Sequence, residues 1–188
     1  MKFLKSKRKL NTSIAIQIEK ARPIRLLILD VDGVLTNGQL WFAPGSTEES
    51  KGFHVRDGLG ILLLQKAGIP VALLTGRDSI VLNERIATLH IKHYYPNLKD
   101  KLPVYETLKA SLNLKDSEIA CMGDDLPDYP LLKRAGLSAT VPGAPAMIRE
   151  CVDIVTTACG GEGAVRELCE LILKAQGKYQ SVIQCYDV

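Results

Sequence analysis

The chain has 188 residues, of which 46% are hydrophobic and 24% are charged, so it is long enough to bury one full core and too apolar for an intrinsically disordered protein. Its formal net charge of +3 comes from 24 Lys and Arg residues against 21 Asp and Glu residues, but five of the cations lie within the first ten positions. The rest of the chain is therefore mildly acidic, which argues against a nucleic-acid partner, because such proteins usually carry basic charge over a face of the fold.

Short apolar runs alternate with longer amphipathic segments along the chain. The runs predict strands, at residues 26–29, 71–74, 92–95, 119–122, 137–141 and 153–156. The amphipathic segments predict helices, at residues 57–67, 78–89, 102–112, 127–135 and 163–175. This alternation is typical of an α/β fold: a three-layer, doubly wound and mostly parallel Rossmann-like sheet, with its ligand site beyond the carboxyl ends of the strands.

The stretch from Thr36 to Val55 breaks this alternation. Two short extended runs flank Pro44-Gly45 there, so we predict a β-hairpin flap. Residues 1–10 are expected to form a flexible basic arm, and residues 177–188 a tail without clear periodicity. The whole chain, residues 1–188, is thus predicted to be a single domain.

The cysteines and histidines show no metal or disulfide pattern. Five cysteines, an odd number with no Cys-x-x-Cys spacing, argue against a disulfide framework and a zinc ribbon, and His90 and His93 are interpreted as ordinary histidines. The apolar runs are too short to span a membrane, and no apolar segment of signal-peptide length follows the basic N-terminus. We therefore expect a cytoplasmic protein with reduced thiols and no membrane partner.

Two carboxylates, Asp30 and Asp32, follow directly on the first apolar strand. An apolar strand that ends in acids is costly unless the acids meet a cation or solvent. Gly33 lets the chain turn sharply and bring backbone N–H groups toward a ligand. For this feature alone, two solvated acids at a strand end remain the plain alternative.

Polar residues also follow two other predicted strands. After the strand at 71–74, Thr75-Gly76-Arg77 offers a hydroxyl and a guanidinium, which suit a phosphate. After the strand at 119–122 comes Gly123-Asp124-Asp125-x-x-Asp128, whose acids repel one another unless a divalent cation or basic residues lie among them. Lys101 lies between these two groups, in a loop or at a helix start.

Taken in order, these motifs resemble the haloacid dehalogenase superfamily of aspartyl-nucleophile phosphotransferases. They are Asp30-x-Asp32-Gly33-x-x-Thr36, Thr75, Lys101 and Gly123-Asp124-Asp125-x-x-Asp128. The resemblance covers about residues 25–177, which is most of the chain.

The resemblance implies roles for individual residues. Asp30 would attack phosphorus and form an aspartyl-phosphate, and Asp32 would act first as general acid and then as general base. Thr75 and Lys101 would hold the phosphoryl oxygens. Asp30, Asp124 and the backbone carbonyl of Asp32 would bind Mg²⁺. The presence of Asp32 favours phosphate ester hydrolysis over dehalogenation.

Two further acids of the last motif have a supporting role in this interpretation. Asp125 and Asp128 are expected to orient Lys101 or waters near the cation rather than to bind metal directly.

The spacing of the motifs leaves no room for a cap domain over the site. Asp30 and Thr75 are 45 positions apart, and Thr75 and Lys101 are 26 apart; the hairpin, helices and a strand already occupy these intervals. We therefore expect either a large substrate or a lid from a neighbouring subunit. Leu40-Trp41-Phe42 of the hairpin would form an apolar surface for such a homo-oligomer, or would pack on its own domain. The tail after Gln176 is expected to be mobile and to reach a neighbouring site.

The closer resemblance is to the family of 3-deoxy-D-manno-octulosonate 8-phosphate phosphatases. It rests on the segments Asp30–Thr36, Val55–Gly58, Leu74–Arg77, Gly123–Asp128, Gly163–Glu167 and Ala175–Lys178. The resemblance implies a capless, Mg²⁺-dependent homotetramer that hydrolyses an acidic sugar phosphate in lipopolysaccharide biosynthesis. The residues it implies in substrate binding are Asp32, His54, Val55, Arg56, Asp57, Gly58, Gly76, Arg77, Arg85 and Lys101.

Some of these positions suit an anion on physical grounds. Asp57-Gly58 opens a predicted helix, whose free N–H groups favour negative charge. Arg77 and Arg85 are eight positions apart, close to two helical turns, so Arg85 is expected to reach the side of its helix nearest Arg77. A solvated helix face is the alternative for Arg85.

The chain departs from the family pattern at two positions. Leu62 stands where the family has a substrate-contacting Arg, and Glu162 stands in Gly160-Gly161-Glu162-Gly163 where relatives often carry a basic residue. Both departures remove positive charge from a site for an anionic ligand, so they bear on the substrate rather than on the phosphatase chemistry.

Three alternative functions follow from the same residues. A phosphatase for another acidic nonulosonate sugar phosphate would keep every catalytic residue. A non-catalytic domain of the same fold has no physical need for the clustered carboxylates. In a phosphoreceiver domain the acid pair and the phosphorylated Asp lie on different strands, whereas Asp30 and Asp32 share one here.

Overall fold

A six-stranded parallel sheet forms the centre of the protein in a computed structural model, which describes residues 14–45 and 49–186. Its strands are β1 (Leu26–Leu29), β4 (Val71–Leu74), β5 (His93–Tyr95), β6 (Ile119–Met122), β7 (Leu137–Thr140) and β8 (Ile154–Val155). They lie in the order β5-β4-β1-β6-β7-β8, and every neighbouring pair is parallel. The predicted parallel sheet is therefore confirmed, whereas the arm predicted at residues 1–10 lies outside the described residues.

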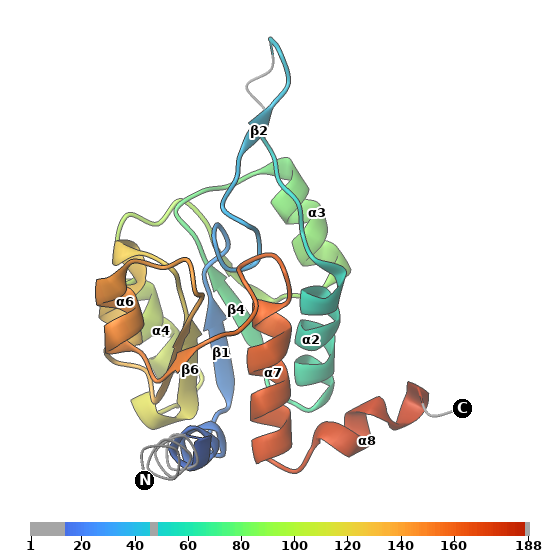
Figure 1. Ribbon diagram of the computed structural model, residues 1–188, viewed down its shortest axis with the longest axis vertical. Coiled ribbons are helices and arrows are strands. Elements are labelled where there is room, and N and C mark those ends of the chain that lie inside the picture. Colours follow the sequence, from blue (N-terminus) through green and yellow to red (C-terminus); the bar gives the residue numbers. More distant parts are fainter. Residues whose placement is uncertain (1–13, 46–48, 187–188) are drawn as a thin grey trace, which may run out of the picture.

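Helices cover both faces of the sheet (Figure 1). They are α2 (Val55–Lys66), α3 (Ile80–Thr88), α4 (Leu102–Ser111), α5 (Tyr129–Leu132), α6 (Ala146–Cys151), α7 (Ala164–Ala175) and α8 (Tyr179–Ile183). Helices α2 and α3 connect β1 to β4 and β4 to β5, toward one edge of the sheet. Helix α4 leads back from β5 to β6, and α5 and α6 then connect β6 to β7 and β7 to β8, toward the other edge. Because parallel crossovers are right-handed, these two sets lie on opposite faces, and α7 packs beside α2. The result is the predicted three-layer, doubly wound fold.

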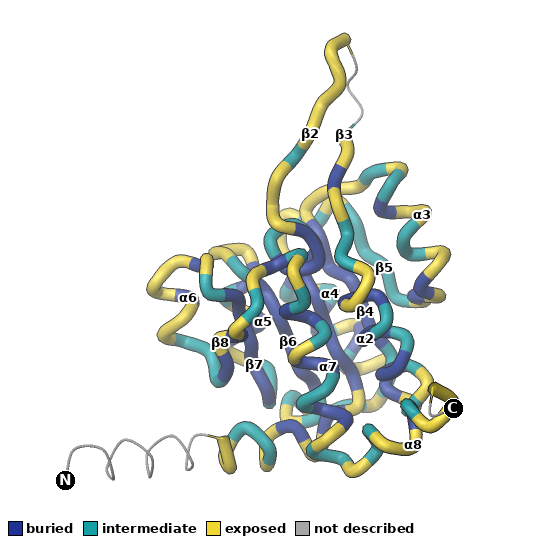
Figure 2. The backbone as a smooth tube through the Cα atoms, turned by 45° about the vertical axis from the view of Figure 1, so that its right-hand side comes forward, coloured by how far each residue is buried: buried dark blue, intermediate teal, exposed yellow. Residues whose placement is uncertain are grey.

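The longest apolar runs of the sequence become the central strands. Every residue of β1, β4 and β6 is buried, which is why their bounds coincide with continuous apolar runs. Helix α7 turns one apolar stripe toward the core and the opposite side to solvent (Figure 2). The stripe consists of Ala164, Val165, Leu168, Cys169, Ile172 and Leu173.

Between β1 and α2 the chain forms the predicted hairpin. Strand β2 (Trp41–Phe42) pairs antiparallel with β3 (Glu49–Ser50), and the hairpin projects away from the sheet (Figure 2). Trp41 is 64% exposed and Phe42 is 55% exposed, so the alternative that these two pack on their own domain is wrong. In the described ranges only this hairpin, helices and strands of the sheet lie between β1 and α4, so no cap domain is present there.

The sequence pattern predicts none of three helical segments: residues 14–21, α6 and α8. The expectation of a mobile tail after Gln176 is wrong as far as residue 186, because α8 buries Val182 and the Lys66 ammonium donates to the Val182 carbonyl at 3.3 Å. A short helix held by tertiary contacts carries too little periodicity to be recognised. None of the described helices is long and apolar enough to cross a membrane.

Candidate active site

The site lies at the point where the strand order reverses. Strands β1 and β6 are neighbours, and the chain leaves them toward opposite edges of the sheet. Asp30 follows β1, and Gly123 and Asp124 follow β6. In doubly wound sheets the crevice at such a switch point, beyond the carboxyl ends of the strands, is where ligands bind.

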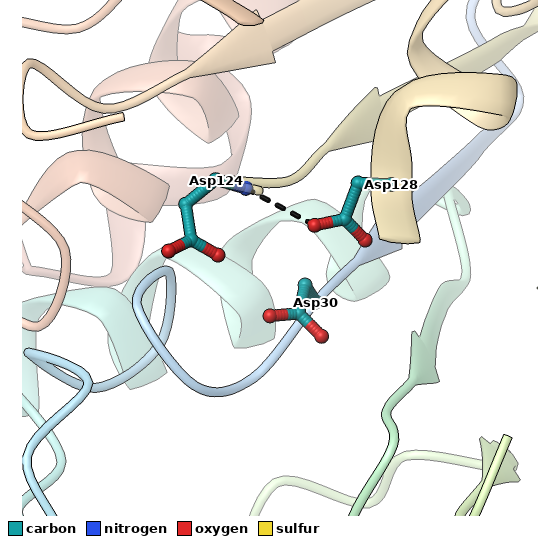
Figure 3. Close-up of side chains that lie close together, drawn as sticks. All are labelled: Asp30, Asp124 and Asp128. Carbon is teal, nitrogen blue, oxygen red and sulfur yellow. Dashed lines mark hydrogen bonds between the residues drawn. The ribbon is translucent and has the colours of Figure 1, made fainter. Parts of the chain in front are cut away.

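Three carboxylates gather at this point (Figure 3). Oxygen atoms of Asp30, Asp124 and Asp128 lie within 4.8 Å of one another. Burial and then the charge of Asp128 raise the pKa of Asp30 to about 6. Burial and then repulsion from Asp30 and Asp128 raise the pKa of Asp124 to about 7. The cluster therefore concentrates negative charge on oxygen donors only, which fits a hard divalent cation such as Mg²⁺.

A buried lysine offsets part of this charge. The ammonium of Lys101, at the start of α4, lies 2.6 Å from both Asp30 Oδ1 and Asp128 Oδ1. Burial alone would lower the pKa of Lys101, but the two carboxylates outweigh it and raise that pKa, so Lys101 stays a cation. Asp128 thus contacts Lys101 as expected, whereas Asp125 accepts from the Leu126 N–H in its own turn.

The loop after β1 approaches Asp124 closely because it has no side chain at Gly33. Gly33 has φ +95°, and a Cβ there would collide with the Asp124 carboxylate. Gly160 packs against the same loop, because a Cβ at Gly160 would collide with the Gly33 carbonyl. The Gly33 backbone is therefore held close to the Asp124 carboxylate.

The Asp32 side chain meets a buried lysine from the hairpin. The Lys51 side chain has no exposed surface, and its ammonium lies 2.9 Å from Asp32 Oδ1 and 2.8 Å from Glu49 Oε1. Burial alone would lower the pKa of Lys51, but its contacts with the carboxylates of Glu49 and Asp32 raise it. Sequence reasoning missed both Glu49 and Lys51. Their spacing of two puts them on one face of an extended segment, but nothing in the pattern indicated that this segment returns to Asp32.

Thr75, Gly76 and Arg77 follow β4, the neighbour of β1 on the other side. Thr75 is 1% exposed, and its hydroxyl accepts a hydrogen bond from the Arg77 N–H at 3.2 Å. The Arg77 guanidinium is 55% exposed and lies 3.4 Å from Glu49 Oε2. The structure therefore places a buried hydroxyl and an accessible guanidinium at the same sheet edge as Asp30.

Arg85 of α3 crosses to the first turn of α2. Its guanidinium donates to the His54 carbonyl at 3.5 Å and packs against Gly58, where a Cβ would collide with it. The alternative of a solvated helix face for Arg85 is wrong. Val55 and Arg56 are exposed at the same turn. His54, Val55, Arg56, Gly58 and Arg85 are thus brought together near the carboxyl edge of the sheet.

The Asp57 carboxylate is occupied within the fold, which leaves the backbone of Asp57, at the start of α2, for the predicted substrate contact. Asp57 is 1% exposed, and its two oxygens accept from the N–H groups of Gly163 at 3.1 Å and Arg166 at 2.8 Å. These N–H groups belong to the N-terminus of α7, where a carboxylate is favourable. Asp57 therefore joins α2 to α7, and the sequence could not show that the side chain points inward.

Replacing Asp57 by Ala is expected to destabilise the protein. Two buried N–H groups would lose their acceptor, at a cost of about 2–4 kcal/mol, which corresponds to a melting temperature lower by about 4–16 °C. Thermal unfolding followed by circular dichroism measures this. The matched control is Arg56→Ala at the exposed neighbouring position, which should shift the melting temperature by less than about 2 °C. Equal melting temperatures for the two variants would contradict the capping role of Asp57.

The two departures from the family pattern occupy different surroundings. Leu62 lies seven residues into α2, about 10 Å below its N-terminus, and packs against the hydrophobic core. Glu162 is exposed in the turn that precedes α7. Leu62 thus contributes to packing, and Glu162 is the departure that faces solvent near the site.

Comparison with known proteins agrees with this geometry. The family described as haloacid dehalogenase-like hydrolase matches residues 95–168. The 3-deoxy-D-manno-octulosonate 8-phosphate phosphatase KdsC of Escherichia coli K12 is 45% identical over 161 residues, which cover 86% of this chain and 85% of that protein.

Two solved structures are similar over nearly the whole chain. A haloacid dehalogenase superfamily hydrolase (subfamily III A) from Legionella pneumophila has a TM-score of 0.91 at 44% identity, covering 95% of this chain and 97% of that one. The 3-deoxy-D-manno-octulosonate 8-phosphate phosphatase from Moraxella catarrhalis, in complex with magnesium, phosphate and KDO, has a TM-score of 0.87 at 40% identity, covering 90% and 97%. The chain therefore belongs to the haloacid dehalogenase-like hydrolases, within the family of the 3-deoxy-D-manno-octulosonate 8-phosphate phosphatases.

Proposed function

We propose that this protein is a Mg²⁺-dependent phosphatase that releases phosphate from 3-deoxy-D-manno-octulosonate 8-phosphate, a step of lipopolysaccharide biosynthesis. The observation that carries the proposal is the cluster of Asp30, Asp124 and Asp128 around Lys101, with Asp32 beside it on the same loop. The names of the Escherichia coli and Moraxella catarrhalis relatives support the choice of substrate.

The residues suit an aspartyl-phosphate mechanism. A carboxylate oxygen of Asp30 attacks phosphorus, the bond from phosphorus to the ester oxygen breaks, and that oxygen takes a proton from the Asp32 carboxyl. Water then attacks the phosphorus of the aspartyl-phosphate and gives a proton to Asp32, which frees phosphate and Asp30. Thr75 and Lys101 hold the phosphoryl oxygens and offset their charge during both steps.

Asp30, Asp124 and the Asp32 carbonyl would hold the cation. A Mg²⁺ ion held by these groups would offset negative charge, which would let an anionic nucleophile approach an anionic phosphate. The raised pKa values of Asp30 and Asp124 support this assignment, because burial and neighbouring carboxylates outweigh the effect of Lys101 on both groups.

Positive charge near the carboxyl edge of the sheet suits an acidic sugar. Arg56 and Arg77 are exposed, and Arg85 lies against the first turn of α2, whose N-terminal N–H groups also favour anions. The Arg77 guanidinium forms an ion pair with Glu49 in the structure, and a substrate carboxylate would compete with Glu49 for this guanidinium. The recognition of a carboxylate by these arginines is part of the proposal.

A panel of phosphate esters tests the function. Phosphate release should be fastest from 3-deoxy-D-manno-octulosonate 8-phosphate, slower from other nonulosonate phosphates, and slowest from neutral sugar phosphates. A clear preference for another acidic nonulosonate phosphate would move the assignment to that substrate. No release from any ester, with Mg²⁺ present, would favour a non-catalytic domain.

Assembly is the second part of the proposal. We infer a homotetramer in which a neighbouring subunit closes the site, because the chain has no cap between its motifs in the described ranges and the hairpin leaves Trp41 and Phe42 exposed. The ordered helix α8 packs on α2 and α7, so the hairpin rather than the tail is the element suited to a neighbour. All five cysteines are free thiols, which fits the proposed cytoplasmic location.

Replacing Trp41 by Asp is expected to weaken the oligomer and to slow turnover of the sugar phosphate. The charge would have to be buried in the subunit contact, which is unfavourable. Light scattering should show smaller particles, and kcat/KM should fall about tenfold or more for the sugar phosphate but much less for p-nitrophenyl phosphate. Wild-type protein that is monomeric and fully active on the sugar phosphate would rule out a lid from a neighbour.

A further inference from the structure

The return strand of the hairpin places a buried cation on the general acid of the proposed reaction. Lys51 follows β3 directly, and its ammonium lies 2.9 Å from Asp32 Oδ1, nineteen positions earlier in the chain. The Lys51 side chain has no exposed surface, whereas the Asp32 side chain is 23% exposed. The ammonium therefore approaches Asp32 from inside the protein and not from the side of the substrate.

Glu49 is the second carboxylate that pairs with the Lys51 ammonium. Its Oε1 lies 2.8 Å from the Lys51 ammonium, and its Oε2 lies 3.4 Å from Arg77. Glu49 is 11% exposed, so the ammonium is enclosed by two carboxylates and little water reaches it. A buried lysine paired in this way has one position, unlike a surface lysine that moves among several rotamers.

We propose that Lys51 is a positioning residue for Asp32. This inference rests on the phosphatase function proposed above. Lys51 holds Oδ1, the only Asp32 side-chain atom with a hydrogen-bond partner among the described residues, and leaves the second carboxyl oxygen for proton exchange. A lysine only donates hydrogen bonds, so its contact with Oδ1 is compatible with a proton on the other oxygen.

The position of Asp32 matters most when the leaving group needs a proton. When a sugar alkoxide leaves, the ester oxygen takes the proton of the Asp32 carboxyl as its bond to phosphorus breaks. A p-nitrophenolate leaves without a proton, because its negative charge is already stable in water. A poorly placed Asp32 therefore slows alkyl esters strongly and aryl esters with good leaving groups weakly.

Lys51→Met tests the role, because methionine has similar length and no charge. The quantity to measure is kcat/KM, which reports only the steps up to formation of the aspartyl-phosphate and not its hydrolysis. We expect a loss of about 100-fold for the sugar phosphate and of less than about tenfold for p-nitrophenyl phosphate. Asp32→Asn should show the same dependence on the leaving group. The double variant should be no slower than Asp32→Asn alone, because Lys51 acts through Asp32.

Lys109→Met is the matched control. Lys109 also pairs with two carboxylates, those of Glu106 and Asp116, and its side chain is 18% exposed, but it lies in α4, away from Asp32. Its loss should change the melting temperature and leave the ratio of the two kcat/KM values as in the wild type. If Lys51→Met does not fold, Glu49→Gln replaces it, and it should show a smaller loss with the same dependence on the leaving group.

The outcomes separate this inference from the proposed function. An equal loss on both esters, or losses that multiply in the double variant, would overturn the role of Lys51 while the phosphatase function stands. A wild-type protein without activity on any ester would overturn the function and this inference together.

Discussion

Asp30→Asn is expected to lower phosphate release by about 10⁴-fold or more while the protein stays folded. The amide has nearly the shape of the carboxylate but does not attack phosphorus. Asp30 is 9% exposed and hydrogen-bonded to Lys101 at 2.6 Å, so a substitution that keeps its shape should disturb the packing little. Lys101 keeps its second partner, Asp128, so no buried charge is left alone.

A control for this variant is available in the same acidic motif. Asp125→Asn removes one carboxylate that is exposed and accepts from the Leu126 N–H, a bond that an asparagine also makes. Its activity should stay within a few-fold of the wild type. Stopped-flow or steady-state phosphate assays on purified protein measure both. Appreciable steady-state turnover by Asp30→Asn would falsify covalent catalysis through Asp30.

The sequence predicted the parts of the fold that are dominated by burial. Strands buried on both faces must be apolar at every position, so the bounds of β1, β4 and β6 could be predicted from the continuous apolar runs of the sequence. The same logic located the site, because parallel strands end at one edge and the polar residues after them must meet there. The cluster of Asp30, Asp124 and Asp128 with Lys101 follows from this rule.

Side-chain direction was not predictable in the same way. Asp57 opens α2 beside residues that face the site, yet it turns inward to α7, more than a hundred residues later. The contact of Lys51 with Asp32 depends on how the hairpin folds back, which no local pattern encodes. Both contacts join charged residues to partners that are distant in sequence, whereas periodicity reports only which faces are apolar.

Asp124→Asn is expected to stabilise the cation-free protein and to remove both activity and the stabilising effect of Mg²⁺. In the wild type without cation, Asp124 has a pKa of about 7 because of burial and then repulsion from Asp30 and Asp128, so its ionised form destabilises the fold at neutral pH. Relief of this repulsion should contribute about 1–2 kcal/mol, after allowance for partial exposure, or about 2–8 °C in melting temperature.

The raised pKa values of Asp30 and Asp124 set the direction in which the stability of the cation-free protein changes with pH. In the native state Asp30 and Asp124 take up protons near pH 6 and pH 7, whereas in the unfolded chain they do so near 3.8. The native state binds more protons between these values, so cation-free protein should become more stable as pH falls from about 8 toward about 5.

Saturating Mg²⁺ should remove this trend and add about 3 kcal/mol to the free energy of unfolding when its concentration is about a hundred times Kd. Melting temperatures measured across this range, with EDTA and with Mg²⁺, test the assignment for the wild type and for Asp124→Asn. A variant that Mg²⁺ still stabilises as much as the wild type would place the cation elsewhere.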